Sequence, residues 1–519
     1  MPVSADHDGP RRLLAIGLDA AEPSLIERWI ADGTLPNLRR LRQAGAYRRL
    51  ASSARWLSGP PWPTFYTGRQ PQDHGLYHHL QWCPERMMTL RPRPDWLPVR
   101  PFWRDLGAAG RKVIALDVPQ AYAPEPFDGI ELSGFASHDA LAPPGAWPAE
   151  LGEAIRRQFG APPRRPEVHG LQSAPALLRL GAELLEATPG LGALAERLMR
   201  ERPWDLCLVV FGAVHRGGHK LWDASNVRGE PDAAEAEKLE GALRDVYFAC
   251  DRALGRLIEI AGADVSVLVF SVHGMGPNTS RTAILPLLLE RILDRGNCAG
   301  PSPRRAKAAL SALRERVPDV WRGALKRQLP VAVQDRLSTF WRLNGIDWSS
   351  TAAISLIADL HGYIRINRRG REALGIVEPG HGFDALCRRI AAGLESFVDA
   401  ETGAPVVSQV LRAEEALAPG PRSSTLPDLL VRWSETPACR HRVLHSPKLG
   451  SVPWPVPGRH PDGRSGNHRG QGFLLGAGPG LPRAAEQSEA DITDLAPTMR
   501  ALLGLPPDPA MVGRPLIAR

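Results

Sequence analysis

Two histidines stand four residues apart, His215 and His219 in "FGAVHRGGHKLWD", and this spacing could do chemistry. On a helix this spacing places both imidazoles on one face, where they can hold one metal ion. Short motifs also arise without function, and two histidines at a helix start can be satisfied by their neighbours. Gly217 and Gly218 between them favour the metal interpretation, because glycines let the backbone pass close to a bound ion.

A third histidine, His468 in "GRSGNHRGQGFLLGAG", lies in a polar, glycine-rich segment that precedes an apolar run. Alone it could be a surface residue. With His215 and His219 it would complete a three-imidazole site, an arrangement that favours zinc with one coordination position left open. We therefore expect these three side chains to converge.

Two further candidates each follow a short apolar run: Asp19 closes "RLLAIGLD" and His273 follows "VSVLVFSV". Asp19 could cap the helix that begins near Pro23, or it could supply the carboxylate that an oxygen-seeking cation needs. His273 could donate to a backbone carbonyl in a glycine turn, or it could act as a metal ligand. The residue types leave these alternatives open.

Ser58 opens "SGPPWPTFYTGRQPQDHG", a stretch in which the density of proline and glycine predicts a loop rather than a helix interior or a central strand. Ser58 could cap a helix whose first turn contains two prolines. Alternatively, it could be a nucleophile presented at that helix start. Three histidines follow closely, and we expect most of them to support other ligands or to lie at the surface: His74, His78 and His79.

The elements that must position these residues are short apolar runs alternating with helical patterns. The longest helical pattern, residues 237–262, has apolar residues at three- and four-residue spacing. Alternation of this kind predicts an α/β fold with a mostly parallel sheet. Such sheets bind ligands beyond the carboxyl ends of their strands, and Asp19, His215 and His273 each stand just past such an end.

The chain is expected to form one catalytic domain over residues 12–519, after a flexible tail at 1–11. Three stretches interrupt the alternating pattern and are expected to be insertions or cap elements over the site: residues 76–105, 160–200 and 281–350. Residues 444–471, dense in Pro, Gly, His and Arg, are expected to form a long functional loop.

Composition excludes several classes of protein. The six cysteines are scattered with no C-x-x-C pair, which argues against a disulfide framework and against a thiolate zinc site. The N-terminus has no apolar signal region, and no apolar run approaches the ~18 residues of a membrane span, so we expect a cytoplasmic protein with no membrane partner. The net charge is +8, but the sequence has no cluster of basic residues interleaved with aromatic residues. The charge is therefore weak evidence for a nucleic-acid polymer, and it suits a small anionic substrate equally well.

Taken in order, the motifs resemble those of the type I phosphodiesterase/nucleotide pyrophosphatase family of the alkaline phosphatase superfamily. "LLAIGLDAAEPSLIERWIADGTLPNLRRLRQAG" is similar to the opening strand, metal-binding aspartate and helix of that family, and the 58–75 stretch resembles its nucleophile loop. "FGAVHRGGHKLW", "VFSVHGMGPN" and "GNHRGQGFLLGAGPGL" resemble its later metal segments, and "DITDLAPTMRALLGLPPDPAMVGRPL" its C-terminal signature. The resemblance implies an alkaline-phosphatase-like α/β/α sandwich with inserted cap elements.

The resemblance also implies roles for the candidate residues. Ser58, ten residues before Gly68, would be the nucleophile and would pass through a seryl-phosphate. Asp19 and His273 would hold the metal ion that binds Ser58. A second ion would be held by His215, His219 and His468. Zn²⁺ is the expected metal, and Mn²⁺ is the alternative.

Three positions depart from the family pattern. His215 stands where the family has an aspartate, and it remains a competent zinc ligand. Val272 replaces the aspartate before His273, which leaves the Ser58 site one carboxylate short and the binding of a second cation open. His79 occupies the position of a phosphate-contacting asparagine. It could donate to a phosphoryl oxygen or supply the missing metal ligand.

We therefore predict a metal-dependent hydrolase of phosphoric esters that acts on a phosphodiester or a nucleotide-type pyrophosphate. One alternative is a sulfate- or phosphonate-ester hydrolase on the same scaffold, because a more cationic site need not prefer phosphate esters. The other alternative, motivated by Val272, is a degenerate relative that binds an anionic ligand without turnover.

Overall fold

The computed structural model describes residues 12–93, 96–121, 126–135, 145–159, 170–293, 346–483 and 489–517, together with Val333. The predicted tail at 1–11 lies outside the described residues. So do residues 160–169 and almost all of 294–345, which belong to two of the predicted insertions. The predicted domain boundaries therefore stay predictions.

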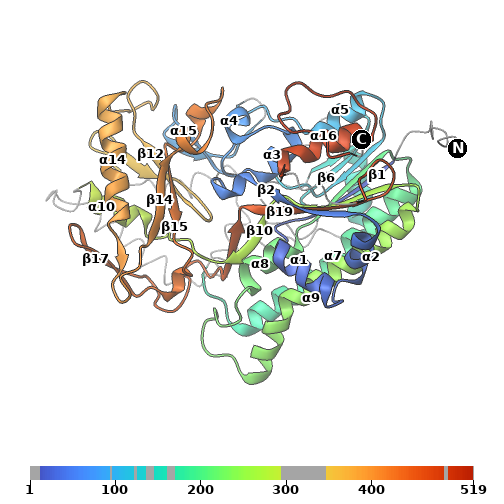
Figure 1. Cartoon of the computed structure of the whole chain (residues 1–519), viewed down its shortest axis with the longest axis horizontal. Coiled ribbons are helices and arrows are strands. Elements are labelled where there is room, and N and C mark those ends of the chain that lie inside the picture. Colours follow the sequence, from blue (N-terminus) through green and yellow to red (C-terminus); the bar gives the residue numbers. More distant parts are fainter. Residues whose placement is uncertain are drawn as a thin grey trace.

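A nine-stranded mixed sheet forms the centre of the molecule (Figure 1). In spatial order its strands are β20 (Ala490–Asp491), β2 (Ala46–Ala51), β19 (Gln471–Ala477), β9 (Ser266–Ser271), β1 (Leu13–Leu18), β8 (Leu206–Phe211), β5 (Val113–Leu116), β6 (Gly129–Ser133) and β7 (Gly145–Trp147). All run in one direction except β19 and β7. The predicted α/β fold with a mostly parallel sheet is confirmed.

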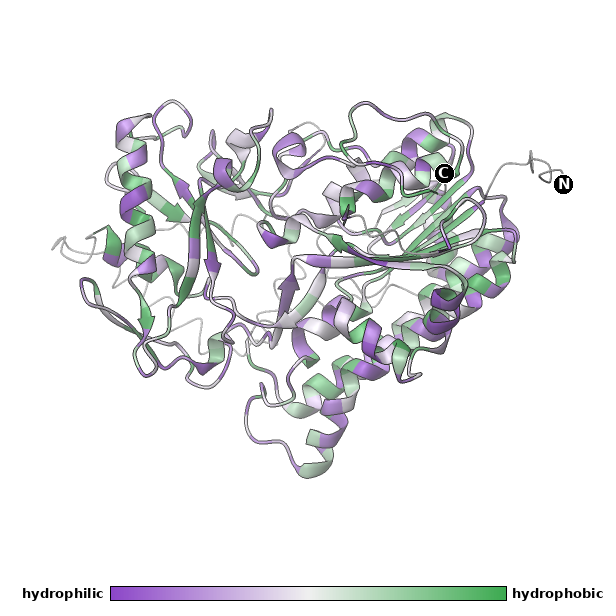
Figure 2. Cartoon of the chain, viewed as in Figure 1, coloured by the Kyte–Doolittle hydropathy of each residue, from purple (hydrophilic) through white to green (hydrophobic). Residues whose placement is uncertain are grey.

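Helices cover both faces of this sheet, which is why β1, β8 and β9 are apolar and buried along their whole length. One face packs against α1 (Pro23–Ala31), α2 (Pro36–Ala44), α7 (Ala174–Glu201) and α9 (Ala233–Ala261). The other packs against α3 (Pro61–Thr67), α5 (Phe102–Ala108) and α16 (Leu495–Leu502). Figure 2 shows the apolar residues concentrated on the central strands. Helix α9 contains nearly all of the pattern that predicted it at residues 237–262.

The loop prediction for residues 58–75 was wrong in part, because two short helices lie within it. Helix α3 begins at Pro61 and helix α4 (Pro71–His74) begins at Pro71. A proline is tolerated in the first turn because the amide that it lacks would have no intrahelical acceptor there. The prolines therefore mark helix starts instead of excluding helices.

The long loop predicted at residues 444–471 was also wrong in part. Short strands occupy much of it: β16 (Val443–Ser446), β17 (Gly450–Pro453) and β18 (Gly466–Arg469). Strand β18 pairs antiparallel with β10 (Gly274–Pro277), which follows β9 directly. This pairing brings β18, which contains His468, to the carboxyl edge of the central sheet.

The described residues between 284 and 454 form a second lobe with its own hydrophobic core. Its four-stranded sheet has the order β11 (Ala353–Ser355), β12 (Gly362–Ile366), β15 (Leu429–Trp433) and β14 (Val407–Arg412). Helices α10 (Leu285–Ile292) and α14 (His381–Glu395) belong to the same lobe, which lies at the left of Figure 1. A small sheet of β13 (Val398–Asp399), β16 and β17 completes it.

No described helix is long and apolar enough to cross a membrane. The five cysteines that the structure describes are all free thiols, as the scattered spacing predicted.

Candidate metal centre and nucleophile site

Three imidazoles meet at the carboxyl edge of the sheet. His215 and His219 lie one turn apart on α8 (Ala213–Leu221), which begins two residues after β8 ends. His468 lies on β18, opposite Met275 of β10. The Nε2 atom of His215 is 3.0 Å from Nε2 of His219 and 3.0 Å from Nε2 of His468. The predicted convergence of these side chains is therefore present in the fold.

This arrangement fits a bound cation. Nitrogen ligands placed about 2.0–2.1 Å from a tetrahedral zinc ion lie roughly 3.3 Å from one another, close to the spacing seen here. The Nδ1 atom of His219 is 2.9 Å from the carbonyl oxygen of Gly466, so the ring proton lies on Nδ1 and the lone pair lies on Nε2, the nitrogen that faces His215. Burial and the neighbouring histidines lower the pKa of His468 well below its usual value, which keeps that imidazole neutral. Neutral imidazoles with converging lone pairs are a metal-binding donor set.

The glycines near these histidines serve packing. A Cβ atom on Gly466 would stand 2.1 Å from the carbonyl oxygen of Gly218, and one on Gly218 would stand 2.9 Å from the Met275 side chain. Glycine at these positions lets α8 approach β18 and β10 closely. His219 and His468 reach each other because of this contact.

Asp19 follows β1 and is 2% exposed. Its Oδ1 accepts a hydrogen bond of 2.7 Å from the Trp62 indole nitrogen, and its Oδ2 is 3.4 Å from Nδ1 of His215. The next residue, Ala20, has a φ of +57°, a left-handed conformation that costs free energy for a residue with a side chain. The cap of α1 is Glu22, so the helix-cap interpretation of Asp19 was wrong.

His273 follows β9 after one intervening residue and lies beside the three imidazoles. Its ring centroid is 4.6 Å from that of His468 and 6.3 Å from that of His215. Neither ring nitrogen has a hydrogen-bond partner among the described residues, so the backbone-carbonyl alternative was wrong. Burial lowers the pKa of His273 to about 4, although Asp19 acts in the opposite direction. A buried imidazole without a protein partner points to a ligand.

Within the described part of the chain, His215, His219 and His468 form the one group of three or more potential ligands that lie within 4.8 Å of one another. Asp19 and His273 belong to no such group. Val272, where a carboxylate would be needed, is fully buried. The second cation therefore stays a prediction.

Ser58 lies just before α3 and is 3% exposed. The helix N-cap is Pro60 and has no side-chain cap, so the capping interpretation of Ser58 was wrong. The Ser58 amide donates to the Tyr363 hydroxyl at 2.9 Å, and Ser58 Oγ accepts from the Leu360 amide at 3.5 Å. Gly59 is required here, because a Cβ atom would stand 2.2 Å from the Tyr77 carbonyl oxygen.

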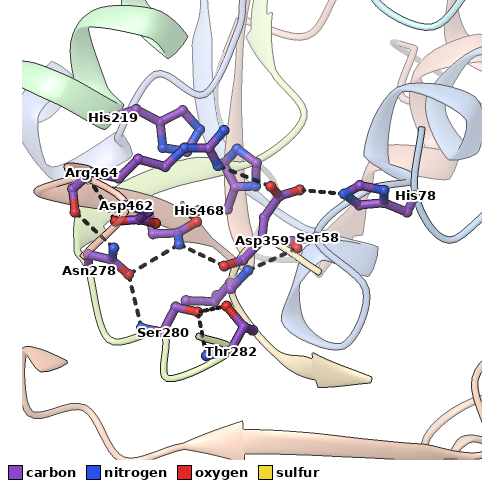
Figure 3. A network of polar contacts seen from close by, with 12 residues as sticks. Ser58, His78, His219, Asn278, Ser280, Thr282, Asp359, Asp462, Arg464 and His468 are labelled. Carbon is purple, nitrogen blue, oxygen red and sulfur yellow. Dashed lines mark hydrogen bonds and ion pairs between the residues drawn. The ribbon is translucent and has the colours of Figure 1, made fainter. Parts of the chain in front are cut away.

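Asp359 of the second lobe is a site residue that the sequence reasoning missed. Its Oδ1 is 3.0 Å from Nη1 of Arg464, and its Oδ2 is 3.4 Å from Nε2 of His78 (Figure 3). The Leu80 amide donates to Nδ1 of His78, so the ring proton lies on Nε2 and faces Asp359. Burial raises the pKa of Asp359, but His78 and Arg464 outweigh it and hold this pKa well below its usual range. No motif marks this residue, because the β11–β12 connection places it.

Replacement of Asp359 by asparagine should lower the free energy of unfolding by roughly 3 kcal/mol, because it leaves the Arg464 guanidinium without its anionic partner in a largely buried place. Urea denaturation of the folded chain measures this loss. Asp105→Asn is the matched control: its ion pair with Arg100 has side chains 43% and 56% exposed, and its loss should change stability little. Equal effects of the two substitutions would contradict the assignment.

His78 and His79 differ in their surroundings. His78 is buried and faces Asp359, whereas His79 is partly exposed and lies against His78, with ring centroids 4.1 Å apart. His79 is not one of the three grouped imidazoles. His74, also buried, is 3.1 Å from the Thr64 hydroxyl and accepts from the Leu76 amide, so it supports the loop around α3 and α4.

Comparisons with known proteins agree with this architecture. The family model described as type I phosphodiesterase / nucleotide pyrophosphatase matches residues 13–369. A search of curated proteins finds no significant match.

Several solved structures share the fold at low sequence identity. A mutant of the alkaline phosphatase PafA has a TM-score of 0.55 at 13% identity, covering 99% of this chain and 100% of the other. Phosphonoacetate hydrolase from Sinorhizobium meliloti 1021, in complex with phosphonoacetate, has a TM-score of 0.52 at 16% identity, with 95% of each chain covered. An inactive variant of murine ectonucleotide pyrophosphatase / phosphodiesterase 5, in complex with AMP, has a TM-score of 0.50 at 12% identity, covering 98% and 100%.

Proposed function

Since the chain belongs to the type I phosphodiesterase/nucleotide pyrophosphatase family of the alkaline phosphatase superfamily, we propose that it is a metal-dependent hydrolase of phosphoric esters. The proposed substrate is a phosphodiester or a nucleotide-type pyrophosphate, and Ser58 is the nucleophile. The observation that carries the proposal is the convergence of three imidazoles, with Nε2 of His215 3.0 Å from Nε2 of both His219 and His468. Ser58 lies in the same polar network as His468 (Figure 3).

The residues present fit one metal ion at His215, His219 and His468, with zinc as the preferred identity. When bound, the ion would act as a Lewis acid that polarises a phosphoryl oxygen and stabilises developing negative charge. The carboxylate of Asp19 faces Nδ1 of His215 and would orient that ring for the ion. A Ser58-side ion held with Asp19 and His273 is proposed as the weaker site, since Val272 supplies no ligand.

The chain's own residues carry the reaction. Ser58 Oγ attacks phosphorus, the bond from phosphorus to the leaving oxygen breaks, and the leaving oxygen takes up a proton. The Ser58 hydroxyl loses its proton in this step, and the resulting seryl-phosphate keeps the second ester group of the substrate. Water then hydrolyses the bond from the Ser58 oxygen to phosphorus, which releases a phosphate monoester and restores the serine. We propose that His79, which lies against His78 and outside the group of three imidazoles, donates a hydrogen bond to a phosphoryl oxygen; the alternative is that it ligates a metal ion.

The charges of the site favour an anionic substrate. The three imidazoles carry no negative charge of their own as ligands, so a cation bound there would attract an anion. Arg464 is already ion-paired with Asp359, and the cation would therefore supply the attracting charge. The test is turnover of chromogenic substrates: a phosphodiester, a phosphomonoester, a sulfate ester and a phosphonate ester. We expect the phosphodiester to react fastest. A preference for the sulfate ester or the phosphonate ester would replace the proposed substrate class with that one. No turnover of any of the four substrates would support a binding protein without catalysis.

Metal content tests the assignment of the two sites. The unmodified chain should retain one tightly held metal equivalent after dialysis, because one complete ligand set is present. Val272→Asp should add a second equivalent by restoring a carboxylate beside His273. Val272→Asn is the matched control, since it has the same shape without the charge. Elemental analysis measures all three, and two tight equivalents in the unmodified chain would overturn the assignment.

A further inference from the structure

A short segment of the second lobe, Asp359–Tyr363, lies directly against Ser58. We call this segment the strap. Its Leu360 amide points at Ser58 Oγ from 3.5 Å, and its Tyr363 hydroxyl accepts the Ser58 amide at 2.9 Å. Ser58 thus has contacts at both its backbone and its side chain with a part of the chain some 300 residues away.

Tyr363 is held rigidly. Its side chain is fully buried, and its ring packs edge to face on Tyr77 with centroids 5.9 Å apart. Strand β12 carries it and pairs with β15, where Tyr363 lies opposite Leu430. The Tyr363 carbonyl oxygen also accepts the Leu356 amide at 2.8 Å. A hydroxyl on so fixed a ring has a defined position.

The chemistry of a phenol makes this contact specific. A tyrosine hydroxyl carries one proton and two acceptor sites. The Ser58 amide uses one acceptor site of this hydroxyl, and the Leu360 amide of the same segment lies 3.5 Å from Ser58 Oγ. The rotation of Ser58 about its Cα–Cβ bond is therefore restricted from the second lobe.

The strap also connects Ser58 to the metal-binding loop. The Asp359 carbonyl oxygen accepts from Nδ2 of Asn467 at 3.0 Å, and Oδ1 of Asn467 accepts the His468 amide at 2.8 Å. The Asp359 carboxylate is held in turn by Arg464 and His78. A chain of contacts therefore runs from Ser58 through the strap to His468 (Figure 3).

We propose that Tyr363 is a positioning residue, and that the strap fixes the Ser58 oxygen relative to the trihistidine centre. The second lobe is then part of the catalytic machinery in addition to covering it. This inference rests on the proposed function, since it assigns a role in the step that Ser58 performs. Misplacing a reacting atom by about 1 Å can cost a hundredfold in rate, which makes such positioning measurable.

The test compares Tyr363→Phe with Tyr77→Phe in the full chain. Each substitution removes one buried hydroxyl from the same aromatic pair, but the Tyr77 hydroxyl accepts the Trp82 amide and does not reach Ser58. For Tyr363→Phe we expect kcat to fall at least tenfold with KM within a factor of two. For Tyr77→Phe we expect a similar drop in thermal midpoint with kcat unchanged within a factor of two. Metal content should be unchanged in both.

Equal kcat values in the two variants would overturn the positioning role. If Tyr363→Phe folds poorly, Tyr363→Met carries the same comparison, because a flexible thioether fills the space without a hydroxyl. Failure of the proposed function is seen separately: the unmodified chain would then lack turnover, or Ser58→Ala would retain it. If the unmodified chain turns over the substrate and Ser58→Ala does not, an unchanged kcat in the Tyr363 variants rejects only the positioning role of the strap.

Discussion

Replacement of Ser58 by alanine should lower kcat for the phosphodiester by about a thousandfold or more, since removing a nucleophile leaves only binding and electrostatic stabilisation. Ser58 is 3% exposed and fixed by contacts from Leu360 and Tyr363. Metal content should stay at the unmodified level, because the three imidazoles do not depend on the serine hydroxyl.

Ser53→Ala is the matched control for this experiment. Ser53 is also buried in the same part of the chain, and its hydroxyl lies 3.4 Å from that of Thr64. Its loss should leave kcat within about twofold, in line with the small effect of one neutral hydrogen bond. Mass analysis after acid quenching should find one added phosphoryl group, still carrying the second ester group of the substrate, on the unmodified chain and none on Ser58→Ala. A Ser58→Ala variant with ordinary kcat would rule out the nucleophile.

Replacement of His219 by alanine should empty the metal centre. One of three protein ligands is lost, and the remaining two come from segments held together partly by the contact between His219 and Gly466. We expect less than about a tenth of an equivalent of metal after dialysis, and kcat to fall with it. The loss should exceed the 10–100-fold weakening that is typical when only an outer partner of a ligand is removed.

Thermal denaturation provides a readout of the same variant that does not depend on activity. A ligand present at about a thousandfold above its Kd stabilises the folded state by roughly 4 kcal/mol. A chelator should therefore lower the melting temperature of the unmodified chain and leave that of His219→Ala unchanged. His445→Ala, an exposed histidine hydrogen-bonded to Ser451, is the control and should behave like the unmodified chain. Full metal content in His219→Ala would disprove the centre.

Much of the site could be predicted from local sequence because parallel strands deliver their next residues to one edge. β1 ends at Leu18 and leads to Asp19, β8 leads to α8, and β9 leads to His273. Each strand was an apolar run recognisable without its neighbours. Ser58 could be predicted only as one of two alternatives, and the structure removes the capping alternative by placing Pro60 at the N-cap.

Residues placed by tertiary contacts could not be predicted. Asp359 and Tyr363 belong to a strap whose position depends on the pairing of β12 with β15 and on Arg464. Neither residue follows a strand end of the central sheet, and neither stands in a spaced motif. The helix that follows Ser58 was expected in both interpretations of that residue. Helix α4 was missed for a different reason: the prolines in the rest of the stretch were taken as breakers, although Pro71 occupies the first position of a helix.

Strand β19, which runs opposite to its neighbours in the sheet, sets the order in which the three histidines of the metal centre can come together. His468 precedes this strand and lies 253 residues after His215, so a nascent chain emerging from the ribosome presents two imidazoles long before the third. β19 must insert between β2 and β9 before the Nε2 atoms of the three histidines can converge. The three-histidine centre can therefore close only after its last histidine has been synthesised and β19 has entered the sheet.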